Sequence, residues 1–208
     1  MEGMPSPNAI LILNLIYKYK WFENPETIAK ALSVDVGTVE SVLRYLEAEE
    51  FIEVQEGGVF ITAKGEKFID DYFSNVLKKR VKDRKFLEDL IHKFKGMDYH
   101  LKTIVMRLQV KADSYEKLLE VLEKLNNEVK VDVISPLTDY IPWMGDYGRR
   151  LDLALSEVKN GNEFYLVREH GSYYNVWYEM KDDIYRLGKL FSIDTRPVIL
   201  PDFEEKKG

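Results

Sequence analysis

The stretch from residue 38 to residue 62 constrains the fold more than any other part of this 208-residue chain. Its first half spaces apolar side chains as in a helix that buries one face, at Val39, Val42, Leu43 and Leu46. Its second half, FIEVQEGGVFIT, has two short β-prone runs on either side of Gly57-Gly58, which is a hairpin signature. The stretch therefore predicts a helix that runs directly into a two-stranded hairpin.

Two further helices are expected before this unit. NAILILNLIYKYK is mostly apolar, and NPETIAKALSV starts with Asn24 as N-cap and Pro25 in the first turn. After the hairpin comes the run ITAKG at residues 61–65. In this order of elements, about residues 9–70 of the predicted domain 1–70 resemble the winged-helix domain of MarR-like and related archaeal transcription regulators. In those families a Leu-Thr-x-x-Gly run closes the wing and opens the next helix, and ITAKG matches it in form.

The resemblance implies a homodimeric regulator of transcription that binds duplex DNA. The helix that begins near Thr38 would enter the major groove, and its copy in the dimer would meet a half-site about 34 Å away. The residues that would contact DNA are Thr38, Ser41, Arg44 and Tyr45 on the helix, with Lys64 and Lys67 near the wing.

The charge of this domain leaves a second kind of partner open beside DNA. Residues 1–70 hold 6 Lys/Arg against 12 Asp/Glu, and the predicted recognition helix carries Glu40 and Glu47 on its outward face. Since DNA affinity depends largely on cations that neutralise phosphates, an acidic helix starts with repulsion. The alternative is therefore a winged-helix protein–protein interaction module that docks a basic partner through its acidic third helix.

Residues 71–96 are expected to form a connector helix and a dimerisation element. Residues 71–95 hold 8 Lys/Arg against 4 Asp/Glu, and the segment Lys78–Lys85 contains a single apolar residue, Val81. Two interpretations stay open. The cations follow a DNA backbone beside the wing, or they line a solvated helix and pair with nearby carboxylates at helical spacing.

Residues 97–208 are expected to form an α+β sandwich with a mixed sheet, so that the whole chain belongs to the α+β class. LKTIVMRLQV, VKVDVIS, EFYLVRE, YYNVWYEM and TRPVILP are interpreted as strands, with a hairpin turn at His170-Gly171-Ser172. Three helices are expected between them, within residues 114–127, 149–161 and 182–192. Asp182 and Asp183 would cap the last of these helices.

Aromatic residues in this half suggest a sensing site. A pocket for a small-molecule effector is predicted around Tyr140, Trp143, Tyr147, Arg149, Arg150 and Trp177, with the two arginines facing an anionic group. The alternatives are that these rings pack the sheet or form an interface between subunits. The domain is accordingly interpreted as a sensor or oligomerisation domain.

Other classes of function lack support in the sequence. There is no cysteine, no pair of histidines at ligand spacing and no phosphate-binding glycine loop, so we expect no enzyme, no metal and no cofactor. No apolar run reaches the roughly 18 residues that a membrane helix needs, which predicts a cytoplasmic chain. The scarcity of glutamine, with abundant lysine and glutamate, is typical of a thermophile.

Overall fold

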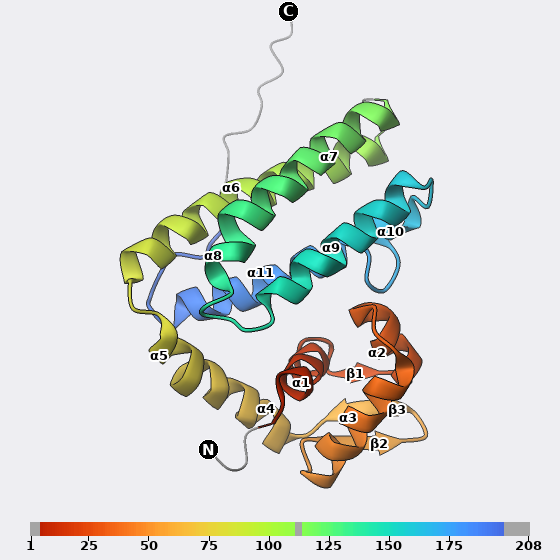
Figure 1. Ribbon diagram of the computed structural model, residues 1–208, viewed down its shortest axis with the longest axis vertical. Coiled ribbons are helices and arrows are strands. Elements are labelled where there is room, and N and C mark those ends of the chain that lie inside the picture. Colours follow the sequence, from red (N-terminus) through yellow and green to blue (C-terminus); the bar gives the residue numbers. More distant parts are fainter. Residues whose placement is uncertain (1–4, 111–113, 198–208) are drawn as a thin grey trace, which may run out of the picture.

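A computed structural model describes residues 5–110 and 114–197 of the chain. The N-terminal part, called the winged helix below, consists of three helices, a β-hairpin and a fourth helix in the order expected from the sequence (Figure 1). Its elements are α1 (Pro7–Tyr19), β1 (Trp21–Phe22), α2 (Pro25–Leu32), α3 (Val36–Ala48), β2 (Ile52–Gln55), β3 (Gly58–Ile61) and α4 (Ala63–Asp71).

Side-chain caps fix where these helices begin. The side-chain oxygens of Asn24, Asp35 and Thr62 accept hydrogen bonds from backbone N–H groups three residues later, at 2.8, 2.9 and 3.0 Å. Each cap satisfies a donor that the first turn would otherwise leave unpaired. The three apolar faces then meet in one core, in which Leu13, Ile28 and Leu46 are fully buried.

The wing is part of a small antiparallel sheet in the order β1-β3-β2. Trp21 pairs with Phe60 and Ile52 with Ile61. At the tip, Gly58 has φ +125°, and a Cβ there would lie 2.2 Å from the carbonyl oxygen of Phe22. Only glycine fits this turn, because β1 passes so close.

The connector is a bent helical segment. α4 continues into a π-helical turn, η1 (Tyr72–Leu77), and then into α5 (Lys78–Arg80). The chain turns at residues 81–83, where Asp83 caps the next helix, α6 (Arg84–Gln109), by accepting from the N–H of Phe86 at 2.9 Å. The predicted connector therefore divides at this bend, and its second half joins the C-terminal part.

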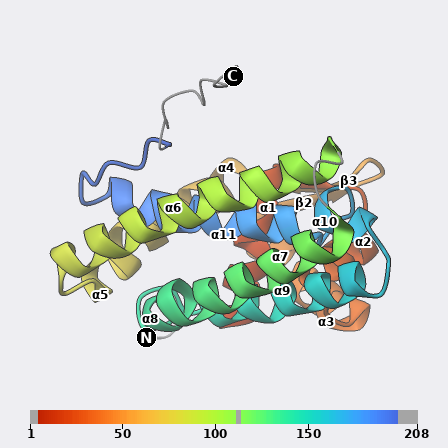
Figure 2. The ribbon, with the colours of Figure 1, turned by 90° about the horizontal axis from the view of Figure 1, so that it is seen from above.

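The C-terminal part is helical, so the expected α+β sandwich with a mixed sheet is wrong. Its further elements are α7 (Tyr115–Val129), the π-helical η2 (Lys130–Ile134), α8 (Ser135–Leu137), α9 (Met144–Lys159), α10 (Phe164–Val167) and α11 (Tyr173–Lys189). The long helices α6, α7, α9 and α11 alternate in direction and pack in a closed ring, α6–α7–α9–α11–α6 (Figures 1 and 2). This is an up-down-up-down four-helix bundle.

The expected strands are helical for a definite reason. LKTIVMRLQV lies at the end of α6, VKVDVIS spans α7 to α8, EFYLVRE contains α10, and YYNVWYEM begins α11. In α11 the buried residues Tyr173, Val176, Trp177, Met180 and Ile184 repeat at helical spacing. β-Branched and aromatic side chains suggested strands, but burial on one helical face decides the structure.

The remaining expectations in this half are also corrected. The turn at residues 170–172 leads into a helix instead of joining two strands, and Ser172 caps it through the N–H of Asn175 at 3.4 Å. Asp182 and Asp183 lie in the middle of α11 and cap nothing. For TRPVILP, residues 195–197 have no regular structure, and the rest lies outside the described residues.

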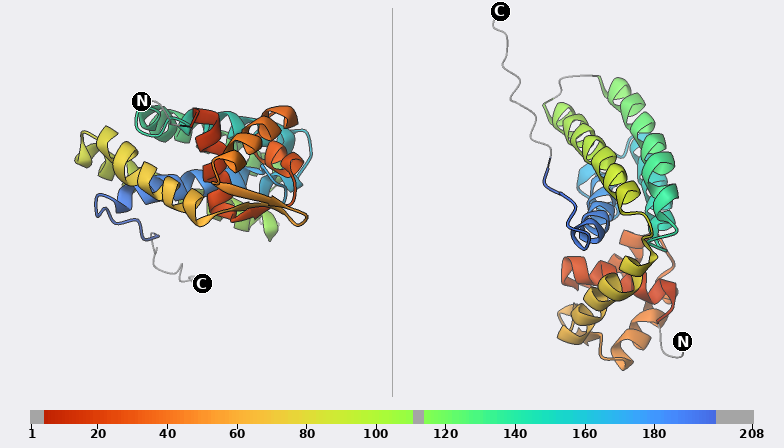
Figure 3. Two further views of the ribbon diagram at one scale, coloured as in Figure 1. Left: turned by 90° about the horizontal axis from the view of Figure 1, so that it is seen from below. Right: turned by 90° about the vertical axis from the view of Figure 1, so that its left-hand side faces the viewer.

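The winged helix lies below one side of the bundle, with α1 facing α9 and α11 (Figure 3). Within the described ranges, no helix combines the length and the apolar character that crossing a membrane requires.

Candidate interaction surface and interdomain polar network

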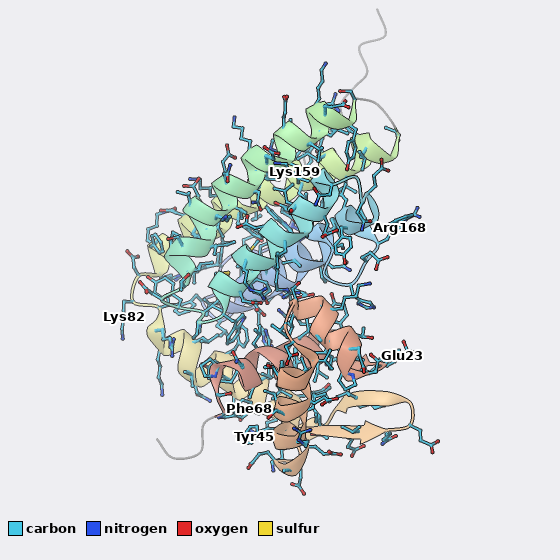
Figure 4. All side chains as sticks on the ribbon, turned by 45° about the vertical axis from the view of Figure 1, so that its right-hand side comes forward. Glu23, Tyr45, Phe68, Lys82, Lys159 and Arg168 are labelled. Carbon is cyan, nitrogen blue, oxygen red and sulfur yellow. The ribbon has the colours of Figure 1, made fainter. Side chains whose placement is uncertain are left out.

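The predicted recognition helix presents a free face to solvent. Val39, Leu43 and Leu46 anchor α3 in the core, and the opposite side of the helix is exposed. All four residues predicted to contact DNA from this helix lie at that surface: Thr38, Ser41, Arg44 and Tyr45. Figure 4 shows Tyr45 at the end of the molecule that lies away from the bundle.

The lysines near this face are already paired. Lys64 contacts Glu50 at 3.2 Å, Lys67 forms an ion pair with Asp71, and Lys20 contacts Glu66 at 2.8 Å. An exposed pair of this kind is weak, yet its carboxylate offsets part of the positive charge that the lysine offers to a phosphate. Lys64 and Lys67, both predicted to contact DNA, are therefore poorly placed to neutralise a backbone.

Unpaired carboxylates dominate the same face. For five exposed glutamates the structure shows no cation within ion-pair distance among the described residues: Glu40, Glu47, Glu49, Glu53 and Glu56. Arg44 is the corresponding unpaired cation of α3, again within the described ranges. We call the exposed side of α3 together with the wing the acidic face, and its uncompensated charge is negative.

Exposed aromatic and apolar side chains accompany these carboxylates. Trp21 is 49% exposed and stacks on Phe60 across the sheet, with ring centroids 6.2 Å apart. Tyr45 and Val54 are also exposed, on α3 and on the wing. Tryptophan and tyrosine contribute much of the binding energy where proteins contact one another.

A second constellation of polar residues lies buried between the winged helix and the bundle. Its centre is Asp183 of α11, which is fully buried. The carboxylate accepts from the Tyr147 hydroxyl and the Trp143 indole N–H, both at 2.6 Å, and from the Asn14 amide at 3.1 Å. Lys18 of α1 completes the shell, with Nζ 2.7 Å from Oδ1.

An adjoining ion pair extends this network by one turn of α11. Arg150 and Glu179 are both buried, and their side chains meet at 2.7 Å. Tyr19 of α1 donates to the other oxygen of Glu179 at 3.0 Å. Burial tends to lower the pKa of Arg150, but the charges of Glu179 and Asp146 outweigh it and raise that pKa.

The tyrosines of the network are held in the neutral form. Burial raises the pKa of Tyr147 well above 10.0, and the carboxylates of Asp183 and Glu179 raise it further. Burial, followed by the charge of Glu179, also raises the pKa of Tyr19. Both hydroxyls therefore act as hydrogen-bond donors that compensate the desolvation of the two carboxylates.

The residues predicted to form an effector pocket lie in different environments. Trp143, Tyr147 and Arg150 belong to the buried network, and Trp177 donates to Asp98 at 3.2 Å in the bundle core. Tyr140 packs edge-on against Phe86 at 6.2 Å.

Arg149 instead joins the two halves of the molecule. Its guanidinium donates to the carbonyl oxygens of Leu32 and Ser33 at 2.6 and 3.1 Å, at the end of α2. It also lines an open hollow of about 640 Å³ beside α9. The structure thus groups three of the six predicted pocket residues around Asp183 and separates the other three.

The sequence analysis missed the residues that bind these side chains. Asn14 and Lys18 stand four residues apart in α1, and Glu179 and Asp183 stand four residues apart in α11. Polar residues at this spacing within otherwise apolar helical faces were the available signal. In the described part of the chain, no group of three or more His, Asp or Glu side chains is placed to hold a metal ion.

Comparison with known proteins identifies no relative. No protein-family model, no curated protein and no solved structure matches this chain. The functional argument therefore depends on the residues and the geometry described above.

Proposed function

We propose that this chain is a cytoplasmic protein-interaction module that docks a basic protein partner on the acidic face. The observation that supports the proposal is the distribution of charge. Five glutamates of the face form no ion pair with any residue that the structure describes, while the lysines around it are held in ion pairs. A basic partner would neutralise these carboxylates, and complementary potentials of this kind speed association and select the partner.

The exposed rings supply the apolar part of such an interface. Trp21 and Tyr45 would lose their remaining contact with water on docking, and the glutamates would form the polar rim. A buried network in turn fixes α1 against the bundle, so the face is presented by a rigid support. Preorganisation of this kind reduces the conformational entropy that is lost when the partner binds.

A DNA-binding transcription regulator is the second candidate, because Thr38, Ser41, Arg44 and Tyr45 form one exposed, continuous side of α3. Duplex DNA carries one negative charge for about every 1.7 Å of its axis and would meet the unpaired glutamates. The negative charge of the acidic face therefore favours a basic protein partner over duplex DNA.

One pair of variants separates the two candidates. If the partner is a basic protein, Glu40→Lys/Glu47→Lys should abolish its capture, whereas Arg44→Glu should leave it intact. If the ligand is duplex DNA, Arg44→Glu should abolish binding, and the lysine variant should strengthen it. Glu116→Lys/Glu120→Lys on α7 changes the net charge equally at exposed positions of the bundle and serves as the control.

The measurement combines crosslinking with a binding titration. A photo-reactive residue at position 45 should capture the same basic protein from source-cell lysate in wild type and control, and none in the Glu40/Glu47 variant. Fluorescence anisotropy with duplex DNA should meanwhile show no binding that Arg44→Glu abolishes. Steeply salt-dependent duplex binding that is lost in Arg44→Glu would reject the protein-partner proposal in favour of the regulator.

A further inference from the structure

The bend between α5 and α6 gathers the strongest positive charge of the molecule. Residues 78–85 include six Lys or Arg and a single carboxylate, Asp83. That carboxylate is engaged as the N-cap of α6. The bend forms an outer corner, where Lys82 extends into solvent (Figure 4). We call residues 78–86 the basic elbow.

Two of the six cations contact the side chain of a specific neighbour. Lys85 pairs with Asp89 at 2.6 Å, and Lys78 lies over the ring of Phe191, 5.8 Å from its centroid. The other four are exposed and form no ion pair with any residue in the described part of the chain: Lys79, Arg80, Lys82 and Arg84. Their charges are therefore available to an external anion.

A partly exposed aromatic ring adjoins these cations. Phe86 is 38% exposed, and its ring rests against Tyr140. The other apolar side chains of the bend point inward, because Leu77 and Leu87 are fully buried and Val81 is nearly so. One ring on a polar corner is too little apolar surface to enter a lipid bilayer, which calls for a whole apolar helix face.

The elbow is also distinct from the acidic face. It lies on the side of the molecule away from α3 and the wing in both Figures 1 and 2. The chain thus presents two separate surfaces of opposite charge.

We infer that the basic elbow binds single-stranded nucleic acid. The four unpaired cations would contact successive phosphates, and Phe86 would stack on one unpaired base. Cationic surfaces combined with exposed aromatic rings bind single strands in this way, without sequence preference. A duplex offers the same phosphates, but its bases are already stacked and cannot use the ring.

The test measures the affinity of the full chain for a labelled oligothymidylate by fluorescence anisotropy at increasing salt concentrations. With about four phosphates neutralised, log K should fall against log salt with a slope of about −3. Lys79→Gln/Lys82→Gln should weaken binding and reduce the slope by about 1.4, since two contacts are removed. Lys117→Gln/Lys124→Gln removes two lysines from α7, far from the elbow, and should leave both quantities unchanged.

A second variant tests the stacking contact. Phe86→Leu keeps an apolar side chain beside Tyr140, and it should weaken oligothymidylate binding roughly 5- to 150-fold at an unchanged salt slope. Circular dichroism would confirm that each variant is folded.

Four results would overturn the inference. These are no binding at low salt, equal affinity for a duplex of the same length, equally effective competition by polyglutamate, and loss of binding in Arg44→Glu. The second would leave as ligand only the phosphates that single strand and duplex share, and the third would indicate an acidic protein. The last would move the binding to the acidic face, a result that leaves the proposed protein partner to be judged by its own crosslinking test.

Discussion

At the scale of single residues, the most consequential feature is the charge of Asp183 in the interdomain core. A carboxylate that loses its water is tolerated only where donors and a cation replace it. Here Lys18 supplies the cation, and Tyr147, Trp143 and Asn14 supply the donors. The stability of the junction therefore depends on every member of the shell.

Asp183→Asn should be among the most destabilising substitutions in the chain. It leaves Lys18 buried without its counter-charge, and breaking a buried pair in this way costs about 3–5 kcal/mol. Urea denaturation would measure the loss. The neighbouring Asp182→Asn is the matched control, because Asp182 is exposed and should change stability by less than about 0.5 kcal/mol. Equal effects of the two substitutions would mean that the network contributes nothing specific.

At the scale of elements, the sequence predicted the winged helix because each of its signals is local. Asn24 as a cap, the spacing from Val39 to Leu46 and the Gly57-Gly58 turn all act within a few residues. The C-terminal half was misread for the opposite reason. Leu101, Ile104 and Val105 look like part of a strand when taken alone, yet they continue the apolar face that begins at Leu87. Only a window that includes the whole of α6 reveals its helical period.

The candidate functional residues show the same division between features that are local in the sequence and features that arise only in the tertiary structure. The exposed side of α3 followed from the helical spacing, and its excess of carboxylates was visible in the sequence. The network around Asp183 was not, because its members come from α1, α9 and α11 and meet only in the tertiary structure. From the sequence alone, Tyr147 and Arg150 were assigned to an effector pocket. The residues that bury them lie far away in the chain, so their burial could not be predicted.

Two helical glycines should respond oppositely to the same substitution. Gly65 of α4 packs against the backbone of the link between α3 and β2, and a Cβ there would lie 2.1 Å from the carbonyl oxygen of Phe51. Gly65→Ala should therefore lower the free energy of unfolding by about 1–3 kcal/mol. Gly96 lies within α6 with nothing within 4 Å of a Cβ, so Gly96→Ala should raise it by about 0.5–1 kcal/mol. Thermal or urea denaturation of both variants checks the prediction, and a shift of the same sign in both would contradict it.

At the scale of the whole molecule, the winged helix and the bundle share one buried boundary. Lys18, Tyr19 and Asn14 of the first contact Asp183 and Glu179 of the second, and Arg149 joins the end of α2 to α9. Because Asp183 and Glu179 are buried at this boundary, losing their contacts exposes both halves together. We therefore expect a single unfolding transition that depends on the protonation of the boundary.

The tyrosines of that boundary set the direction of its pH dependence. The pKa of Tyr147 is raised well above 10.0, so the folded chain keeps a proton that the unfolded chain releases near that pH. The folded state then binds more protons than the unfolded state between the two pKa values. Stability is consequently complete below about pH 10 and falls as the pH rises above it.

Urea denaturation from about pH 8 to about pH 11 measures this fall, and each such tyrosine contributes up to about 1.4 kcal/mol per pH unit. Tyr147→Phe lowers stability at every pH because Asp183 loses a donor, but it should reduce the alkaline slope by about that amount. Tyr178→Phe, which removes a hydroxyl from a side chain that is 59% exposed, is the comparison variant. An unaltered slope in the Tyr147 variant would show that the boundary does not hold this proton, and would place the alkaline sensitivity elsewhere in the molecule.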